Sequence, residues 1–355
     1  MQLNAFKLVQ RVVFRVHRTI ENLFPQRLSN VRRIFPVQSK EISMVVLRKN
    51  PKFPTALLGS FTFWNLFKKK EEGEETPEDK LVMTIKRSIL CVQRGELNKA
   101  EQMLHLALRM AQDLQSKDGI TYIYDVMANL AIEKGEFEKA EKLFVNVMQR
   151  LFGDGLKETH IKMLHISSKI AHMAGLQGNY EKAKQGFEWT LQKLEEKLKL
   201  KEIEEEIEDV RELWAMTKNW YGQTLMELER VKEAKECFLA ALEVLTEIYG
   251  KAHKEALMLL NNLGFVCIRL GEISAAEDYL QQALTLAKEI PDLAEIHVFR
   301  ANLGLVYLHQ GLLQKATEFC TLSWRLSKKT KNDDALDQAN YCLEEIRKVQ
   351  EKKSQ

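Results

Sequence analysis

One six-residue pattern recurs six times in the chain and constrains its fold more than any other feature. It begins with a turn residue, has an apolar residue two positions later and ends with alanine, as in Gly95-Glu-Leu-Asn-Lys-Ala100. The other copies occupy residues 135–140, 178–183, 229–234, 271–276 and 311–316, so that successive alanines are 40, 43, 51, 42 and 40 residues apart. This near-constant period predicts a solenoid of similar units, each packed against its neighbours.

Each unit is predicted to be a pair of antiparallel helices. The glycine ends the first helix in a left-handed turn, and the alanine lies where the second helix approaches the first closely. Four residues after each alanine stands a larger side chain: Leu104, Phe144, Phe187, Phe238, Leu280 and Cys320. Seven residues before each turn stands a small one: Ser88, Ala128, Ala171, Gly222, Gly264 and Gly304, with Glu229 taken as the fourth turn. We expect small and large residues to interlock.

We therefore expect an all-α solenoid of about six helix pairs over residues 80–332. The chain has only 16 glycines and six prolines among 355 residues, which suits helices and argues against a turn-rich β-sandwich. The pairs should lie near residues 81–114, 121–154, 164–198, 214–248, 257–290 and 297–330, followed by a capping helix and tail over 333–355. The unit resembles the tetratricopeptide repeat, in the longer variety found in kinesin light chains.

The longest interval between repeats contains an acidic stretch at residues 193–212. Its apolar residues recur at helical spacing, so we expect extended helices of the third and fourth units that meet in a charged projection. A binding patch for a basic partner is the functional alternative to a solvated helix face.

The N-terminal part of the chain differs from the rest in charge. Residues 1–70 hold 14 lysines and arginines against two acids, whereas residues 71–355 hold 39 against 48. On a helix, Lys7, Arg11, Arg15 and Arg18 would share one face, beside valines. This pattern is typical of a mitochondrial presequence, expected over residues 1–35, with a plain basic helix or a nucleic-acid-binding arm as alternatives.

Residues 53–67 carry no charge and are followed by three lysines. As a helix they would extend about 22 Å, short of the bilayer's hydrocarbon core of about 30 Å. We expect a membrane or sorting segment here, with an interfacial or buried segment as the alternative. Residues 36–52 are then a linker and residues 68–79 a charged hinge, in which Pro77 is suited to start a helix.

No catalytic or metal-binding motif is present. The sequence lacks HExxH, GxSxG, a phosphate-binding loop and a dinucleotide fingerprint. His160, His165 and His172 have no matching carboxylate, and the five widely spaced cysteines contain no CxxC pair. We expect buried free thiols, no metal or cofactor, no small-molecule substrate and no enzyme. The acidic balance of the body disfavours nucleic acid as a partner.

A repeat array has a concave surface, which is lined by those first-helix residues that do not take part in packing between helices. Asparagines there can both donate to and accept from an extended peptide backbone, or can instead link neighbouring helices. The expected partner-binding residues are Tyr122, Asp125, Asn129, Asn219, Asn261, Asn262, Arg269, Asn302 and His309. In the kinesin-light-chain-like repeats that these copies resemble, the residues matching Asn262 and Asn302 contact bound peptide.

A closer resemblance is carried by residues 120–144, ITYIYDVMANLAIEKGEFEKAEKLF, and by the order of basic start, apolar segment, hinge and repeats. These features are similar to the mitochondrial tetratricopeptide repeat protein 19 family, over roughly residues 80–350. In the first seventy residues only composition and order match.

That resemblance implies a protein of the mitochondrial inner membrane that binds respiratory complex III, the cytochrome bc1 complex. It implies support of the assembly and upkeep of this complex, including removal of fragments of the Rieske iron–sulfur subunit. The alternative is a general peptide-binding adaptor for chaperones or transport. A presequence followed by a stop segment favours a body in the intermembrane space, and a segment too short to stop transfer would leave it in the matrix.

Overall fold

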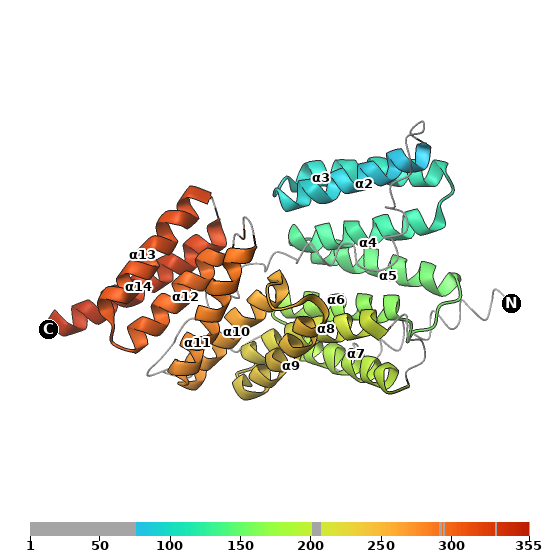
Figure 1. The fold of residues 1–355 in the computed structure, drawn as a ribbon. Coiled ribbons are helices and arrows are strands. Elements are labelled where there is room, and N and C mark those ends of the chain that lie inside the picture. Colours follow the sequence, from blue (N-terminus) through green and yellow to red (C-terminus); the bar gives the residue numbers. More distant parts are fainter. Residues whose placement is uncertain (1–75, 201–206, 291–292, 294, 331, 355) are drawn as a thin grey trace, which may run out of the picture. The chain divides into compact units, whose positions relative to one another are not determined.

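The computed structural model describes residues 76–200, 207–290, 293, 295–330 and 332–354. The expected presequence, linker and apolar segment lie outside the described residues. All regular structure within the described ranges is helical, which confirms the predicted all-α repeat fold (Figure 1). The chain divides into two compact units, one ending at Ile166 and the other beginning at Ser167, so the boundary falls inside helix α6 (Ile161–Leu176).

The first unit contains two helix pairs of closely similar length. Their bounds are α2 (Pro77–Gln93), α3 (Leu97–Asp113), α4 (Lys117–Glu133) and α5 (Phe137–Gly153). Helix α2 packs chiefly on α3, and α4 packs on α5 and α3. The core lies between these helices and contains Ile85, Leu104 and Ile123, none of which is exposed.

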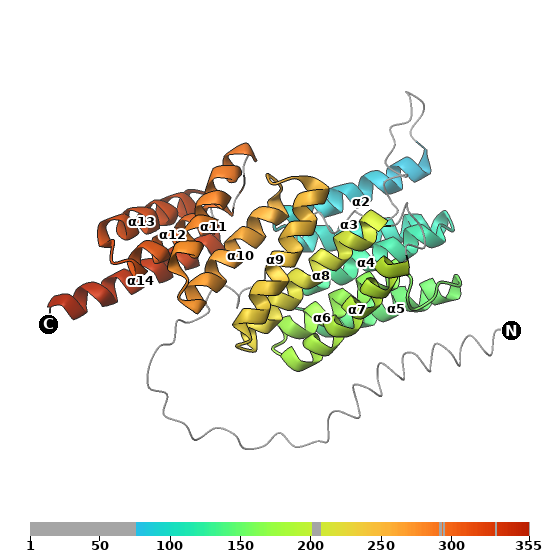
Figure 2. The same ribbon diagram turned by 60° about the horizontal axis from the view of Figure 1, so that its bottom comes forward.

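The second unit continues the same arrangement to the C-terminal helix. Its helices are α7 (Tyr180–Leu200), α8 (Ile207–Glu227), α9 (Val231–Tyr249), α10 (Lys254–Leu270), α11 (Ile273–Leu286), the short 3-10 helix η4 (Ala287–Glu289), α12 (Ile296–His309), α13 (Leu313–Thr330) and α14 (Asp333–Ser354). Consecutive helices pack on each other, and α14 also packs on α12 (Figures 1 and 2). This nearest-neighbour packing is the arrangement expected of a solenoid.

Helix α2 begins at Pro77, three residues before the start of the array expected at Lys80. Its start is defined by a capping box, in which the Thr76 hydroxyl accepts from the Asp79 amide at 3.1 Å and the Asp79 carboxylate accepts from the Thr76 amide at 3.0 Å. Proline suits the first helical position because its missing N–H would have no partner there. Residues 77–79 of the expected hinge are therefore helical.

The predicted left-handed turns between paired helices are present at all six positions. The φ angles are 76° at Gly95, 74° at Gly135, 78° at Gly178, 77° at Gly271 and 78° at Gly311. Glu229 adopts the same conformation with φ 59°, although it carries a side chain. After each of these residues the chain closes the first helix, as where the Glu136 amide donates to the Ala131 carbonyl at 2.8 Å.

Small residues of the first helices meet large residues of the second, as predicted. A Cβ atom added at Gly222 would lie 2.6 Å from the Phe238 ring, and one added at Gly264 would lie 2.6 Å from Leu280 Cγ. One added at Gly304 would overlap Cys320 Sγ. The six large residues are fully buried: Leu104, Phe144, Phe187, Phe238, Leu280 and Cys320.

The expectation that every cysteine is a free thiol is wrong for two of the five. Cys320 on α13 and Cys342 on α14 form a disulfide with Cα atoms 6.0 Å apart. Cys91, Cys237 and Cys267 are free and buried, and burial raises the pKa of the Cys237 and Cys267 thiols to about 11. The spacing of Cys320 and Cys342 gave no sign of the disulfide, because only the packing of α14 on α13 brings the two residues together.

The helices around the acidic stretch are long, as predicted. Helices α7 and α8 have 21 residues each, and their apolar residues Leu194 and Val210 are buried. Residues 201–206, which connect them, lie outside the described residues. The binding patch suggested for this stretch stays a prediction.

Ion pairs join neighbouring repeats on the side of the turns. Glu101 of α3 accepts from Lys134 at 2.6 Å and from Lys139, while Glu136 accepts from both lysines at 2.9 Å. In the second unit Lys235 of α9 pairs in the same way with Glu272, which precedes α11. Lys134 and Lys139 lower the pKa of Glu101 from 4.5 to about 2 through their hydrogen bonds.

We expect Glu101→Gln to lower the free energy of unfolding by about 1 kcal/mol at neutral pH, the upper end for pairs near the surface. Because the folded pKa of Glu101 is lowered, its contribution is complete above about pH 4.5 and is lost as pH falls towards 2. Denaturant unfolding of both proteins from pH 7 to pH 2 measures the difference. Glu138→Gln on the exposed face of α5 is the control, and a wild-type advantage that persists at pH 2 contradicts the assignment.

Candidate protein-binding surface

Polar side chains link successive first helices of the second unit. The Ser168 hydroxyl of α6 lies 2.8 Å from the Thr217 hydroxyl of α8. Further along, amides bond to amides: Asn262 of α10 donates to Asn219 of α8 at 3.2 Å, Asn302 of α12 donates to Asn261 of α10 at 2.7 Å, and Gln338 of α14 donates to Asn302 at 2.5 Å. We call these five amide residues the amide ladder.

The amide ladder changes the interpretation of the predicted asparagines. Asn302 is 1% exposed and uses both its donor and its acceptor side within the chain. Asn261 is 5% exposed and accepts from Asn302. These two side chains thus link helices, as in the alternative drawn from the sequence. Asn219 and Asn262 are half-buried and retain capacity for further hydrogen bonds.

The predicted residues of the first unit all lie on α4. Asn129 is buried and donates to the Asp125 carbonyl at 2.8 Å and to the Asp125 carboxylate at 3.2 Å. Its own Oδ1 is buried without a hydrogen-bond partner among the described residues. Tyr122 is half-buried, and burial, with the nearby Asp125 charge, raises the pKa of its phenol. On α4, these residues together present the Tyr122 ring, the Asp125 carboxylate and the acceptor Oδ1 of Asn129, which is unpaired among the described residues.

Arg269 and His309 lie at the C-terminal ends of α10 and α12, about two helical turns from the ladder asparagines of the same helices. Arg269 pairs with Glu229 in the preceding turn. His309 is exposed. The structure therefore brings the asparagines of the second unit together but leaves these two residues apart from them.

Sequence reasoning missed Gln338, Ser168 and Thr217 as members of the same series of links. Gln338 follows the last copy of the repeat pattern, so the six-residue pattern could not find it. A polar residue at a position that is otherwise apolar in an amphipathic helix was the available signal, since Gln338 is 1% exposed and its neighbours Ala335, Ala339 and Cys342 are not exposed.

Two of the histidines considered from the sequence make contacts within the chain. His172 stacks on Trp220 with ring centroids 4.5 Å apart, and burial lowers its pKa to about 3. The His160 ring accepts from the Lys162 amide at 3.2 Å. Among the described residues no group of three or more histidine, cysteine or acidic side chains is placed to hold a metal ion.

No helix within the described ranges is both long enough and apolar enough to cross a bilayer. The apolar stretch at residues 53–67 lies outside those ranges.

Comparison with known proteins identifies the family. Residues 214–289, which form α8 to α11, match the tetratricopeptide repeat. The chain is 51% identical over 292 residues to "Tetratricopeptide repeat protein 19 homolog, mitochondrial" of Drosophila melanogaster, covering 82% of this chain and 78% of that protein. This chain belongs to the tetratricopeptide repeat protein 19 family. The human family member, "Tetratricopeptide repeat protein 19, mitochondrial", is 31% identical over 285 residues, covering 78% of this chain and 75% of its own length.

Solved structures support the fold of this family member independently. BtubC (BKLC) from P. vanneervenii superposes with a TM-score of 0.53 at 22% identity, covering 67% of this chain and 92% of that one. A Rap protein complexed with Competence and Sporulation Factor gives a TM-score of 0.55 at 16% identity, covering 77% of this chain and 71% of that one. At these identities the likeness concerns the fold alone.

Proposed function

We propose that this chain is a non-catalytic scaffold of the mitochondrial inner membrane that binds respiratory complex III and supports its assembly and maintenance. On this proposal its work includes clearing fragments of the Rieske iron–sulfur subunit. The observation that carries the proposal is the 51% identity over 82% of the chain to a relative named as mitochondrial. The helical repeat array supplies the kind of extended surface with which such proteins bind other proteins.

The basic, acid-poor start of the chain supports a mitochondrial address. The proposed order is a presequence, a short apolar segment at the inner membrane and a body in the intermembrane space. The disulfide between Cys320 and Cys342 supports that side of the membrane, because disulfides persist in oxidising compartments and are rare where thiols are kept reduced.

The proposed contact surface is the set of first-helix residues that the repeat packing leaves accessible. On α4 these are Tyr122 and Asp125, which are half-buried. In the second unit they are Asn219, Asn262, Arg269 and His309. The buried side chains of Asn129, Asn261 and Asn302 are proposed to stabilise this surface through their hydrogen bonds within the chain.

Native electrophoresis of mild-detergent mitochondrial extracts tests the proposal. The full chain is expected to comigrate with the complex III dimer and to leave that position when the dimer is absent. Deleting residues 1–70 should abolish the mitochondrial location. Migration apart from complex III in intact mitochondria would contradict the scaffold role and leave the general adaptor as the working interpretation.

A charge reversal on α4 tests the proposed surface itself. We expect Asp125→Lys to lower the fraction that comigrates with complex III at least fivefold, because a repulsive charge at an interface costs binding energy. The fold should lose only about 1 kcal/mol, the value of the hydrogen bond to Asn129. Glu138→Lys, on the exposed face of α5 in the same repeat, is the matched control. Equal comigration of the two variants would rule out this face of α4.

A further inference from the structure

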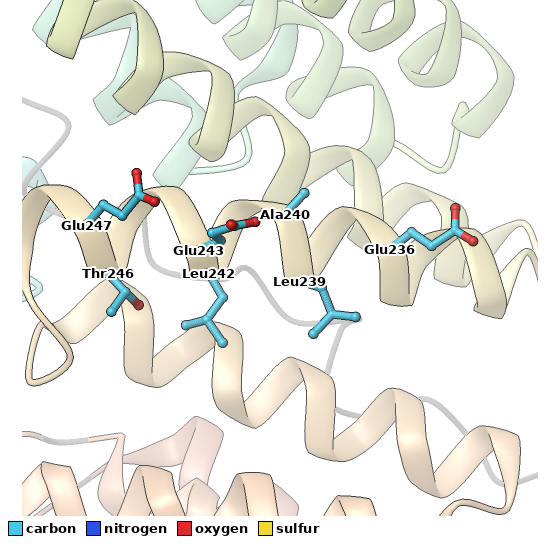
Figure 3. Close-up of a pocket in the computed structure, with 7 residues that line it drawn as sticks. All are labelled: Glu236, Leu239, Ala240, Leu242, Glu243, Thr246 and Glu247. Carbon is cyan, nitrogen blue, oxygen red and sulfur yellow. The ribbon is translucent and has the colours of Figure 1, made fainter.

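Helix α9, the second helix of the fourth repeat, bears a shallow, wide-open hollow of about 710 Å³ that residues of α9 alone line (Figure 3). We call it the α9 groove. Its lining residues are Glu236, Leu239, Ala240, Leu242, Glu243, Thr246 and Glu247. None of them belongs to the first-helix surface proposed above.

The groove has an apolar stripe. Leu239, Leu242 and Thr246 are three and four residues apart, so they lie on one side of the helix, as Figure 3 shows. Leu239 is 39% exposed. Leu242 is only partly buried, although it packs on the core that includes Leu257 and Phe299. The stripe therefore leaves Leu239 exposed, with the partly buried Leu242 and Thr246 beside it.

Three carboxylates accompany the stripe. Glu236, Glu243 and Glu247 are seven and four residues apart and are all exposed. Glu247 pairs with Arg211 of α8, but neither Glu236 nor Glu243 forms an ion pair with any residue in the described part of the chain. Two other charges of α9 are paired, Glu233 with Arg230 and Lys235 with Glu272.

The negative charge extends beyond α9 itself. The first turn of α8 carries Glu208 and Asp209. Arg211 touches Glu247, so this turn lies at the same end of the groove. A ligand of the groove therefore meets apolar surface beside a negative field, which attracts cations and repels the anionic lipids of a membrane.

We propose that the α9 groove docks an amphipathic, basic helix of a partner protein. A helix repeats its surface every seven residues, so two lysines or arginines seven residues apart would meet in turn Glu236 and Glu243, which are unpaired within the described residues. Apolar side chains on the same face of the partner would cover Leu239 and Leu242, so that the two helices pack side by side. This inference does not depend on complex III, because it concerns a second helix, whereas the residues proposed above to contact that complex lie on first helices.

A synthetic peptide tests the charge and apolar pattern directly. The probe is a fluorescein-labelled 18-residue helical peptide with two lysines seven residues apart beside a leucine stripe. Its anisotropy is followed as full-length protein is added in mild detergent at 50 mM and 300 mM salt. We expect saturable binding that weakens with salt, and binding at least tenfold weaker by the double variant Glu236→Lys/Glu243→Lys. Leu239→Ser should weaken binding severalfold at both salt concentrations.

Two controls decide the result. Glu318→Lys changes an exposed glutamate of α13 at the same position of the repeat as Glu236, and it should bind the peptide like wild type. A scrambled peptide of the same composition should bind at least tenfold more weakly. Wild-type affinity in the double variant, or equal binding of the scrambled peptide, would overturn the proposal. Circular dichroism of each variant confirms that it is folded.

Discussion

Gly264→Ala is expected to lower the free energy of unfolding of the second unit by about 3 kcal/mol, the upper end for overpacking in a closely packed core. The added methyl group would lie 2.6 Å from Leu280 Cγ and 3.0 Å from its Cδ2. Leu280 is fully buried, so in a closely packed core its side chain moves aside only by displacing its neighbours. Helices α10 and α11 would have to separate, which also disturbs the packing of α12 on both. Urea unfolding of the full chain, followed by tryptophan fluorescence, measures the loss.

Two further variants separate overpacking from a general intolerance of alanine in α10. Gly271→Ala changes the glycine that ends the same helix, where an added Cβ meets nothing within 4 Å and only the φ of 77° is unfavourable. It should cost about 1 kcal/mol. The double variant Gly264→Ala/Leu280→Ala should lose less unfolding free energy than the two single variants lose together, because the added methyl group then occupies the space that the leucine leaves. Additive losses would contradict direct contact between the two positions.

Reduction of the disulfide is expected to make α14 open about a hundredfold more often, while α14 stays packed most of the time and the rest of the second unit stays folded. The bond joins residues 22 apart in the sequence, for which the chain-entropy model gives about 3 kcal/mol. Without it α14 keeps its packing on α12 and α13 and the Gln338 hydrogen bond to Asn302. The hydrogen-exchange rates of the α14 amides, measured with and without a dithiol, should be about a hundredfold higher in the reduced protein.

Cys342→Ser should show the fast exchange in both conditions. Cys267→Ser, which removes a buried free thiol, should respond to the dithiol as wild type does. If α14 exchanges equally fast before and after reduction in the wild type, the disulfide contributes nothing to holding the helix.

The parts of the fold that repeat could be predicted from the sequence, because each copy is evidence for the others. Glu229 is the clearest case, since its place in the period identified a left-handed turn that its residue type disfavours. The contacts of Gly264 and Gly304 with the following helix followed from the same register. The disulfide did not, because Cys342 lies beyond the last copy of the pattern.

The binding surface was less accessible to sequence reasoning. An asparagine on a first helix can hydrogen-bond either to a bound peptide or to the next helix, and its residue type does not show which. For Asn302 the hydrogen-bond distances show a link between helices, because it donates to Asn261 and accepts from Gln338. No sequence motif marks the α9 groove either. Glu236 and Glu243 look like ordinary solvent-exposed residues in the sequence, and only the structure shows that they form no ion pair within the described residues.

The first and last helices of the repeat array differ in how they are held, so the resistance to mechanical unfolding depends on which end of the chain is pulled. Helix α2 is packed chiefly on α3 and bears no covalent link to it, whereas α14 is tied to α13 by a sulfur bridge. An unfolding machine that pulls from the N-terminal side meets one helix at a time. One that pulls from the C-terminal side has to draw a closed loop of chain through its pore. Quality-control proteases that engage the N-terminal side should therefore remove this protein faster than those that engage its tail.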